Sequence, residues 1–480
     1  KDAADFESLE GMLVRIKEPM YVSEVFALGR FGELVLSARD RIYHPNNHQR
    51  LSAEQTRDLN ARSRIVLDDG LSVQNPNPIP NLSAPDTSGT RRLGDTARGV
   101  QGVLTWGFDV YRIQPTQATV FEPRNARPAA PERVGGELRA ASLNVLNYFT
   151  TLGSRGASNA PELVRQRDKL VETIIGLDAD VLGLIEIENN QGTALSDLLA
   201  AVNARLGSNV YALTNSGVPG TDAIKVAVVY KSASVRPVGN PVVPTDPDFV
   251  VDGGLRPPVA QRFASVANNG NFWFVVNHLK SKGSCPSAAD SPDRDLGQGC
   301  WNVSRVRQAG ALNRWVAELT AASGERDVLM VGDFNAYLRE DPIAAIEAAG
   351  FDNLIQRVDK DERYSFVFGG ESGTLDYAFA SDAMRKQISG VTVWHVNADE
   401  PPVLDYNTEF KTDDRYAVTP FRSSDHDPVL VGLKLRADAF VAAPTLDAVL
   451  PVSAQAQSTV TISNIAAAPS NPGALAELSV

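Results

Sequence analysis

Polar and ionisable residues stand at the ends of several apolar segments between residues 137 and 437 of this 480-residue sequence. They are Asn144 in SLNVLNY, Glu186 in LGLIEIEN, His278 in FVVNHLK, Asp333 and Asn335 in LMVGDFNA, Asp376 in TLDYAFAS, and Asp425 and His426 in SSDHDPV. Each comes at or after an apolar stretch, so we expect each near the carboxyl end of a strand. In open α/β proteins that end is where sites assemble.

The spacing of the acidic residues favours a site for a hard cation. Side chains alternate along a strand, so Glu186 and Glu188 should share one face, as should Asp333 and Asn335. Burying a carboxylate among apolar residues is costly without a compensating cation or donor, and several converging carboxylates repel one another. Oxygen ligands without a thiolate favour Mg²⁺, with Mn²⁺ or Ca²⁺ as alternatives.

Taken singly, these residues also have ordinary structural interpretations. Asp and Asn after a strand often bond their own backbone in a turn. Asp376 can simply begin a strand, Asn144 can be a satisfied polar core residue, and Glu188 can cap the segment that follows. We assign structural positions to three of the five histidines, which are His44, His48 and His395.

The elements that must position these residues change character along the chain. Short apolar segments broken by turn residues over 6–124 predict a small β-barrel or sandwich. Residues 125–136 form a linker rich in Pro, Arg and Gly. Apolar strands then alternate with helix-period segments over 137–437, which predicts an α/β domain. Residues 438–480 are expected to be a low-complexity tail or the start of a further module.

Composition and cysteine content limit the classes of protein. The formal net charge is −12, which argues against a general polyanion-coating protein but not against an enzyme with carboxylate-bound metal. No apolar run approaches the roughly 20 residues that span a bilayer. Cys285 and Cys300 bracket a polar loop that a disulfide would stabilise by roughly 3 kcal/mol, and the alternative is two unrelated thiols in a cytosolic chain. We expect the disulfide, and a secreted protein whose leader has been removed.

The motifs and their order along the chain resemble those of the endonuclease/exonuclease/phosphatase superfamily, the family of pancreatic-type deoxyribonucleases. The resembling segments lie between residues 143 and 429 and are LNVLNY, DVLGLIEIEN, NHLKSKG, GDFNA, LDYAFAS and SSDHDPV. GDFN followed by SDHDPV is the most specific pair. EIEN, NHLKSKG, the cysteine-bounded loop and the N-terminal β module are similar to the secreted bacterial nuclease branch.

The resemblance implies a fold and a reaction. The fold would be a four-layer α/β sandwich of two β-sheets flanked by helices, preceded by an OB-like β-barrel over 6–124. The reaction would be metal-dependent hydrolysis of phosphodiester bonds in DNA, with RNA as a second candidate and little sequence specificity. We expect a monomer that does not insert into membranes.

The resemblance also implies roles for single residues. Glu186 would be the principal metal ligand, supported by Asn144 and Asp425, and Asp333 would orient the attacking water. His278 and His426 would contact the phosphate oxygens. Asp376 would pair with His426, and Asp222 would orient His278. Three further residues would bind the substrate phosphate: Asn335, Arg256 and Lys280. Extra negative charge on the phosphate oxygens suits a metal and a cationic imidazole, and a carboxylate fixes the imidazole tautomer.

Three alternatives stay open. The same catalytic set serves phosphomonoesterases and lipid phosphodiesterases, although we expect no exposed aromatic hairpin of the kind that a membrane enzyme would use. The β module could bind nucleic acid, but it is not plainly basic, so we favour packing against the catalytic domain. Positive residues around the cysteine loop are expected to contact the nucleic-acid backbone, against the alternative of a solvated loop; they are Lys280, Lys282, Arg294, Arg305 and Arg307.

Overall fold

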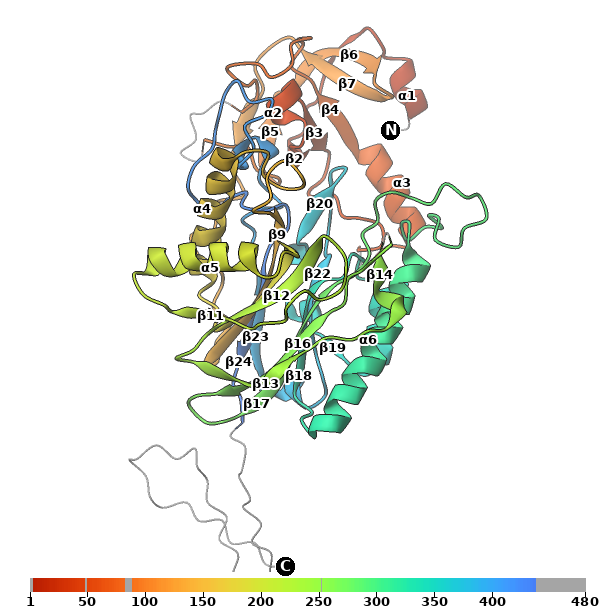
Figure 1. Cartoon of the computed structure of the whole chain (residues 1–480). Coiled ribbons are helices and arrows are strands. Elements are labelled where there is room, and N and C mark those ends of the chain that lie inside the picture. The colour runs from red at the N-terminus through yellow and green to blue at the C-terminus, as the bar shows by residue number, and fades with distance from the viewer. Residues whose placement is uncertain (1–2, 48–49, 83–88, 252, 437–480) are drawn as a thin grey trace, which may run out of the picture.

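The structure, a computed structural model, describes residues 3–47, 50–82, 89–251 and 253–436 (Figure 1). The predicted tail over 438–480 and His48 lie outside these residues. Within the described ranges, no helix combines the length and apolar character needed to cross a membrane.

The N-terminal module is built on an eight-stranded sheet with the order β1-β6-β7-β4-β3-β2-β5-β8. Its strands are β1 (Leu13–Arg15), β2 (Met20–Glu24), β3 (Leu34–Ser37), β4 (Arg64–Leu67), β5 (Thr96–Arg98), β6 (Gln101–Gly107), β7 (Val110–Pro115) and β8 (Val120–Glu122). The strand pairs among the described residues leave β1 and β8 at opposite edges, so the predicted closed OB-like barrel is not confirmed.

Three helices accompany this sheet, and the longest has a clear start signal. They are α1 (Ala3–Glu7), α2 (Leu28–Phe31) and α3 (Ala53–Ser63). Before α3, the Ser52 hydroxyl accepts a hydrogen bond from the Gln55 N–H at 3.1 Å, and the Gln55 side chain accepts from the Ser52 N–H at 3.0 Å. This capping box satisfies two backbone donors at the helix start.

The turn between β6 and β7 exposes aromatic side chains, and the sequence expectation of no exposed aromatic hairpin is therefore wrong. Phe108 and Asp109 have φ values of 52° and 61°, the left-handed conformation of a two-residue hairpin turn. Phe108 is 90% exposed and Trp106 is 49% exposed. A cavity of about 630 Å³ beside this turn is lined by Phe26, Trp106 and Phe108 among others, and by none of the predicted site residues.

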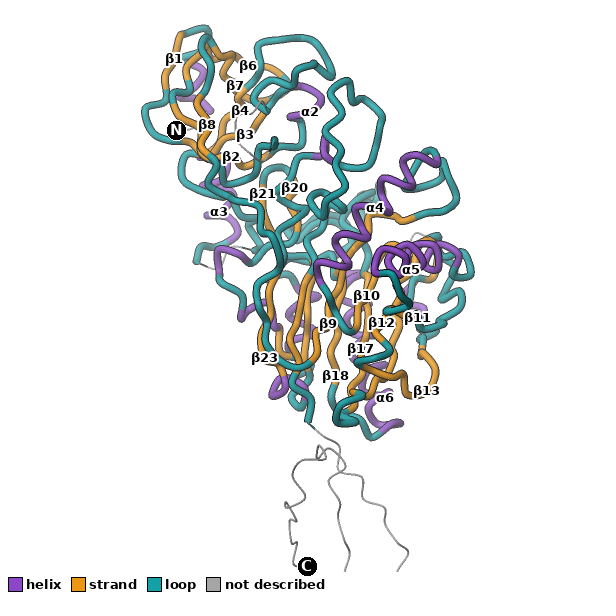
Figure 2. The backbone as a smooth tube through the Cα atoms, turned by 90° about the vertical axis from the view of Figure 1, so that its left-hand side faces the viewer, coloured by secondary structure: helices purple, strands orange, loops and turns teal. Residues whose placement is uncertain are grey.

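Residues 137–436 form a sandwich of two mixed six-stranded sheets (Figure 2). The first has the order β11-β12-β10-β9-β24-β23, with β11 (Tyr211–Leu213), β12 (Ile224–Lys231), β10 (Val181–Glu188), β9 (Leu138–Tyr148), β24 (Val429–Leu433) and β23 (Ile388–Val393). The second has the order β13-β16-β17-β18-β22-β19, with β13 (Val235–Val242), β16 (Val259–Ser265), β17 (Asn271–His278), β18 (Val328–Asp333), β22 (Asp376–Ala380) and β19 (Asp352–Asn353).

Helices cover both outer faces, so the sandwich has the predicted four layers. One core joins α4 (Ala160–Leu177) and α5 (Thr193–Leu206) to the first sheet. Another joins the two sheets to each other and to α6 (Asn302–Ser323) and α7 (Asp341–Ala348). The sheets approach closely at Gly183, where an added Cβ would lie 2.7 Å from Cγ2 of Val276 on the facing sheet.

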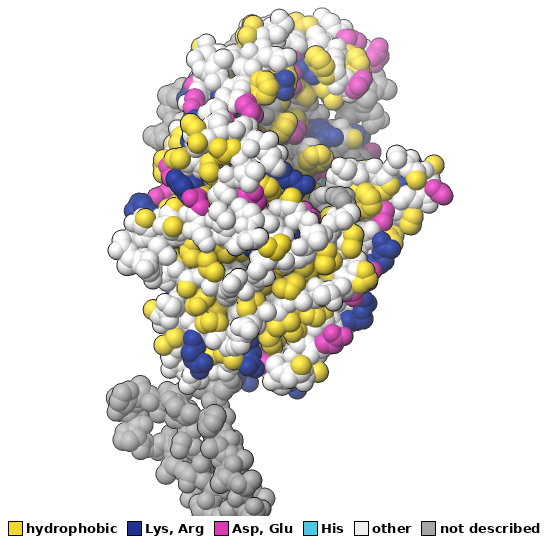
Figure 3. Space-filling view, in the orientation of Figure 1, with side chains coloured by type: hydrophobic (Ala, Val, Ile, Leu, Met, Phe, Trp, Pro, Cys, Tyr) yellow, Lys and Arg dark blue, Asp and Glu magenta, His cyan; other side chains and the backbone are white. Residues whose placement is uncertain are grey.

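The remaining elements are short. They are β14 (Val250–Val251) paired with β15 (Gly254–Leu255), β20 (Phe366–Phe368) paired with β21 (Glu371–Gly373), and the 3-10 helices η1 (Pro247–Phe249), η2 (Leu354–Arg357), η3 (Lys360–Glu362), η4 (Met384–Gln387) and η5 (Pro402–Leu404). Lys, Arg, Asp and Glu side chains are interspersed on the face shown in Figure 3, with no single basic patch there.

Candidate active site

The predicted site residues meet because parallel and antiparallel strands end at the same edge of the sandwich. His278 and Asp333 end the parallel strands β17 and β18 and are register partners. Asp376 begins β22, which is antiparallel to β18, and Asp333 and Asp376 are partners across that pair. Asp376 therefore does not lie at the carboxyl end of its strand, as we expected. The same expectation is wrong for Asp425 and His426, which precede the antiparallel strand β24.

His426 and Asp376 form a buried dyad. Nδ1 of His426 lies 2.8 Å from Oδ2 of Asp376, and the same oxygen accepts a hydrogen bond from the Ser365 hydroxyl at 2.7 Å. The ring of His426 packs on Phe366 with centroids 4.7 Å apart. These contacts fix the imidazole so that its Nε2 lies 3.9 Å from Oδ2 of Asp333. Ser365 is a site residue that no sequence motif indicated.

Asp333 is the central carboxylate of the cluster. Its Oδ1 accepts from the backbone N–H of Asn335 at 2.8 Å, and its Oδ2 accepts from the side chain of Asn144 at 3.4 Å. Nε2 of His278 lies 3.7 Å from the same Oδ2. Burial raises the pKa of Asp333, while His426 opposes the shift and Asp376 adds to it.

Glu186 reaches the cluster through an irregularity in β10. The pairing register shifts between Ile185 and Ile187, and Glu186 has a φ of 68°. The regular alternation expected for Glu186 and Glu188 therefore does not hold. Oε2 of Glu186 accepts from the backbone N–H of Asn147 at 3.0 Å, and its Oε1 lies 3.9 Å from Nε2 of His278. Burial, and then the charge of Asp425, raise the pKa of Glu186.

Glu188 has the structural role that the sequence left open. Its Oε2 accepts hydrogen bonds from the backbone N–H groups of Thr150 and Thr151 at 2.8 and 3.2 Å. It also accepts from the side chain of Asn190 at 2.7 Å. Glu188 therefore holds the loop after β9 rather than the reacting groups.

Several non-glycine residues of the site adopt left-handed backbone conformations. Glu186, Asn335, Leu146 and Asn147 have φ values of 68°, 48°, 54° and 50°. Such conformations cost of order 1–3 kcal/mol each and persist where the surrounding structure imposes them. The left-handed conformations of Glu186 and Asn335 turn the backbone at the positions where these side chains enter the site.

The predicted phosphate-binding residues surround one backbone carbonyl. The side chains of Arg256 and Asn335 both donate to the carbonyl of Leu279, at 3.3 and 3.2 Å. Nε of Arg256 lies 3.7 Å from Oδ2 of Asp222, so Asp222 contacts this arginine and not, as the sequence suggested, His278. Lys280 follows in the chain, and its ammonium lies 4.9 Å from the ring of Trp301.

The cysteine loop is closed by the predicted disulfide between Cys285 and Cys300. Arg305 donates to the carbonyls of Cys300 at 2.8 Å and Lys280 at 3.1 Å, which ties the loop to the segment after His278. Lys282 pairs with the buried carboxylate of Glu340. These two cations are used inside the protein, whereas the exposed Arg294 and Arg307 remain candidates for contact with a nucleic-acid backbone.

The two imidazoles of the site have opposite electrostatic environments. Burial lowers the pKa of His278 well below its ordinary value, and the neighbouring charges of Arg256, His426 and Lys280 act in the same direction. Burial also opposes protonation of His426, but Asp376, Asp333 and Asp425 outweigh it and raise its pKa well above the ordinary value. The two rings therefore differ in the charges that surround them: cations act on His278, and carboxylates act on His426.

The donor set suits a hard divalent cation. Glu186, Asp425 and Asp333 bring carboxylates together, and Asn144 adds an amide. Burial first, and then the negative charge of Asp425, raise the pKa of Glu186. Ligand atoms of Asp333, Asp376 and His426 also lie within 4.8 Å of one another. We favour the set of Glu186, Asp425, Asp333 and Asn144, because Nδ1 of His426 and Oδ2 of Asp376 already engage each other at 2.8 Å.

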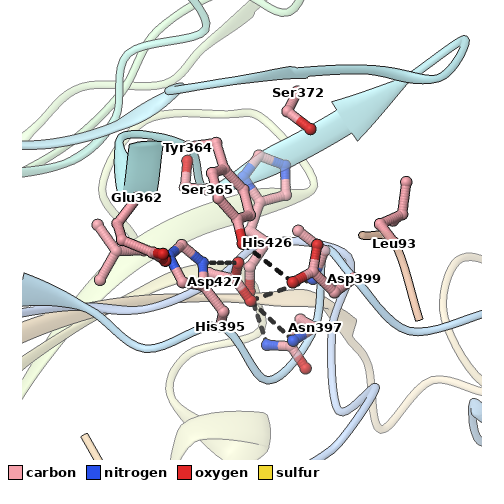
Figure 4. A network of polar contacts seen from close by, with 12 residues as sticks. Leu93, Glu362, Tyr364, Ser365, Ser372, His395, Asn397, Asp399, His426 and Asp427 are labelled. Carbon is pink, nitrogen blue, oxygen red and sulfur yellow. Dashed lines mark hydrogen bonds and ion pairs between the residues drawn. The ribbon is translucent and has the colours of Figure 1, made fainter. Parts of the chain in front are cut away.

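A second buried polar network lies next to His426 (Figure 4). Nδ1 of His395 lies 2.8 Å from Oδ2 of Asp427, and its Nε2 lies 3.1 Å from Glu362. The ring of His395 stacks on Tyr364 with centroids 3.9 Å apart. The sequence assigned His395 to structure without a partner, and only the second aspartate of SSDHDPV hinted at one.

Comparison with known families agrees with this geometry. The model of the endonuclease/exonuclease/phosphatase family matches residues 141–426, more than half of the chain, and the protein belongs to this family. Family members are hydrolases of phosphodiester or phosphomonoester bonds. Residues 1–125 match a family described as a domain of unknown function. A search of curated proteins found no match.

Three solved structures are among those similar to this one. A mannosyl-6-phosphatase of Bacteroides thetaiotaomicron is 17% identical, with 62% of this chain and 99% of that chain covered and a TM-score of 0.39. The human nocturnin catalytic domain with bound sulfate is 16% identical, covering 62% and 94%, with a TM-score of 0.38. TDP2 of D. rerio, complexed with a single-strand DNA product, is 16% identical, covering 61% and 97%, with a TM-score of 0.38.

Proposed function

We propose that this protein is a secreted, divalent-metal-dependent nuclease that hydrolyses phosphodiester bonds of DNA with little sequence specificity. The observation that carries the proposal is the buried pair of imidazoles, His278 and His426, whose Nε2 atoms lie 3.7 and 3.9 Å from Oδ2 of Asp333 at one edge of the sandwich. Membership of the family supports phosphoester hydrolysis. The disulfide supports secretion, because such bonds persist in oxidising compartments.

Glu186, Asp425 and Asn144, with Asp333 beside them, would hold the cation, which we propose to be Mg²⁺, with Mn²⁺ or Ca²⁺ as alternatives. When bound, it supplies positive charge that stabilises the developing negative charge on the phosphate oxygens. The raised pKa of Glu186 supports this assignment, since a cation would offset the repulsion from Asp425.

The chain's own residues supply the proton transfers. Asp333, whose burial makes it a stronger base than an exposed aspartate, orients a water molecule and accepts its proton as the water oxygen attacks phosphorus. The bond from phosphorus to the leaving oxygen breaks, and Nε2 of cationic His426 gives that oxygen its proton. Asp376 accepts the Nδ1–H of His426 and so fixes the orientation and charge of the ring.

The neighbouring donors bind the phosphate. Neutral His278 offers one N–H without adding charge beside the carboxylates. Asn335 and Arg256, both anchored on the carbonyl of Leu279, extend the donor surface, and Lys280 adds a cation next to them. This group recognises a phosphodiester and no base, which supports low sequence specificity.

Digestion of plasmid DNA tests the proposal. We expect cleavage with Mg²⁺ or Mn²⁺, loss of cleavage with a chelator, and recovery when the metal is restored in excess. Replacing His278 and His426 together by Ala should abolish cleavage. Intact DNA in the presence of both metals, or full cleavage by the double variant, would refute it.

One observation favours a second candidate, a lipid phosphodiesterase. The exposed Trp106 and Phe108 could enter a lipid interface, as amphipathic aromatic side chains do. Turnover of plasmid DNA, a phosphomonoester and sphingomyelin by the same preparation separates the candidates. We expect DNA to be the preferred substrate, and preferred turnover of sphingomyelin would establish the alternative.

A further inference from the structure

We propose that residues 41–47 of the N-terminal module position the catalytic loops, so that this module completes the active site. The role of this stretch in catalysis rests on the proposed function, whereas its contacts with the neighbouring segments are observed in the structure. This stretch lies between β3 and α3, touches the segments that carry Asp376 and Asn335, and binds Asp399 in the polar network next to His426. We call it the 41–47 loop.

The first contact reaches the segment before Asp376. The side-chain oxygen of the buried Asn47 accepts from the backbone N–H of Thr374 at 3.0 Å, and its amide donates to the carbonyl of Arg363 at 3.0 Å. Thr374 donates its hydroxyl to the same carbonyl at 2.9 Å. Asn47 thus joins the segment that contains Ser365 to the segment that enters β22, and these two provide the contact of Ser365 with Asp376.

A backbone bridge holds the same segment in place. The N–H of His44 donates to the carbonyl of Ser372 at 2.9 Å, and the N–H of Ser372 donates to the carbonyl of Ile42 at 2.8 Å. Ser372 is fully buried. The 41–47 loop therefore pairs with β21 through one parallel bridge, between Tyr43 and Ser372, and both hydrogen bonds of that bridge are in place.

The second contact reaches the loop after Asn335. The side chain of Asn46 donates to Oε1 of the fully buried Glu340 at 3.0 Å. Oε2 of Glu340 accepts from the backbone N–H of Tyr337 at 3.0 Å. The ring of His44 stacks on Tyr337 with centroids 3.7 Å apart. Asn335 lies two residues before Tyr337, so these contacts restrict the turn that aims its side chain.

The third contact reaches the segment of His426 through the network in Figure 4. Arg41 pairs with Asp399 at 2.7 Å and lies over the ring of Tyr364 at 4.0 Å. The Tyr364 hydroxyl donates to Asp399 at 2.9 Å, and its ring stacks on His395. His395 in turn holds Asp427, the neighbour of His426 in the chain.

Asp427 is braced from two sides, and this makes it a rigid support for its neighbour. Its Oδ2 lies 2.8 Å from Nδ1 of His395, and its Oδ1 accepts from the backbone N–H of Asn397 at 2.7 Å. The Asn397 side chain donates to the carbonyl of His426 at 2.7 Å. His395 and Asp427 are therefore positioning residues that act through the backbone of His426.

Positioning explains these contacts better than attachment alone. A linkage between two modules can land anywhere on the partner, whereas Asn47 and Asn46 bind residues within five positions of Asp376 and Asn335. Arg41 reaches His426 less directly, through Tyr364, His395 and Asp427. Catalytic groups must be held within about 0.5 Å of productive geometry, and a misplacement of about 1 Å can cost about a hundredfold in rate. The buried polar atoms of these contacts leave the catalytic loops few alternative arrangements.

The test compares two asparagines that make equivalent bonds. Asn47→Ala removes one bond to a backbone carbonyl and one from a backbone N–H, next to the site. Asn203→Ala removes the same pair of bonds, to Tyr211 at 2.9 Å each, on α5 away from the site. Both variants are measured as full-length protein with Mg²⁺, on plasmid DNA and on bis(4-nitrophenyl) phosphate.

We expect Asn47→Ala to lower kcat on both substrates by about tenfold or more. KM should change by less than about twofold, and Asn203→Ala should keep wild-type kcat. Equal losses in the two variants would overturn the positioning role. A loss on plasmid DNA with wild-type turnover of the small diester would also overturn it, and would show that the 41–47 loop docks substrate.

Hydrogen exchange gives a result that does not depend on turnover. We expect amides in segments 374–377 and 421–428 to exchange faster in Asn47→Ala than in the wild type, and unchanged in Asn203→Ala. Unchanged exchange in Asn47→Ala overturns the inference even if the rate falls. If the wild type hydrolyses no phosphodiester, the proposed function fails while this measurement still decides the structural claim.

Discussion

The pH dependence of stability should report His395. The imidazole is buried and pairs with Asp427 at 2.8 Å and with Glu362 at 3.1 Å. Burial lowers its pKa, but these carboxylates, with Asp399, outweigh burial and raise the pKa to about 9. The same bond to His395 lowers the pKa of Glu362. Replacing His395 by Gln removes the titrating group and keeps a polar side chain.

The sign and size of this pH dependence follow from the linkage between protonation and folding. Below pH 6.5 the imidazole is protonated in both the folded and the unfolded chain, and its ion pairs contribute fully to stability. As the pH rises from 6.5 through about 9, the unfolded chain loses this proton first, and the contribution disappears. A pKa of about 9 against an ordinary 6.5 corresponds to at most about 3 kcal/mol.

Urea unfolding at pH 6, 7.5 and 9 measures this contribution. With a slope of roughly 3 kcal/mol per molar urea, the wild-type midpoint should fall by up to about 1 M relative to His395→Gln over this range. His44→Gln is the matched control, because burial lowers the pKa of His44 to about 3 and its titration affects stability only below pH 6.5. If His395→Gln keeps the wild-type pH dependence between 6.5 and 9, the assigned ion pairs are wrong.

Three further perturbations test the site and its surroundings. Asp376→Asn should lower kcat on DNA by about 10²–10⁴-fold, because His426 loses the carboxylate that holds it protonated, and an unchanged kcat would contradict the dyad. Mg²⁺ at a hundred times its Kd should stabilise the wild type by about 2.7 kcal/mol in thermal unfolding, and Glu186→Gln should lose most of that gain if Glu186 is a ligand. Replacing Cys285 and Cys300 by Ser should lower the free energy of unfolding by about 3 kcal/mol; an equal urea midpoint in the two proteins would argue against this stabilisation.

The sequence by itself determined the catalytic sandwich and most of its site. Apolar strands and helix-period segments are local patterns, and β9, β10, β17 and β18 follow the segments predicted for them. The polar residues at their ends were identifiable because a carboxylate or imidazole beside a buried strand needs a partner. Glu186, His278 and Asp333 are the clearest cases, since their distances of 3.7–3.9 Å bring together segments far apart in the chain.

Tertiary structure alone decided how the site is supported and charged. The opposite pKa shifts of His278 and His426 depend on which charges surround each ring, and those charges come from segments distant in the chain. The bulge at Glu186 broke an alternation that a regular strand would keep. The open N-terminal sheet, the exposed Phe108 and the partners of His395 depend on strand pairing and long-range contacts, and spacing along the chain does not encode which distant segments will meet.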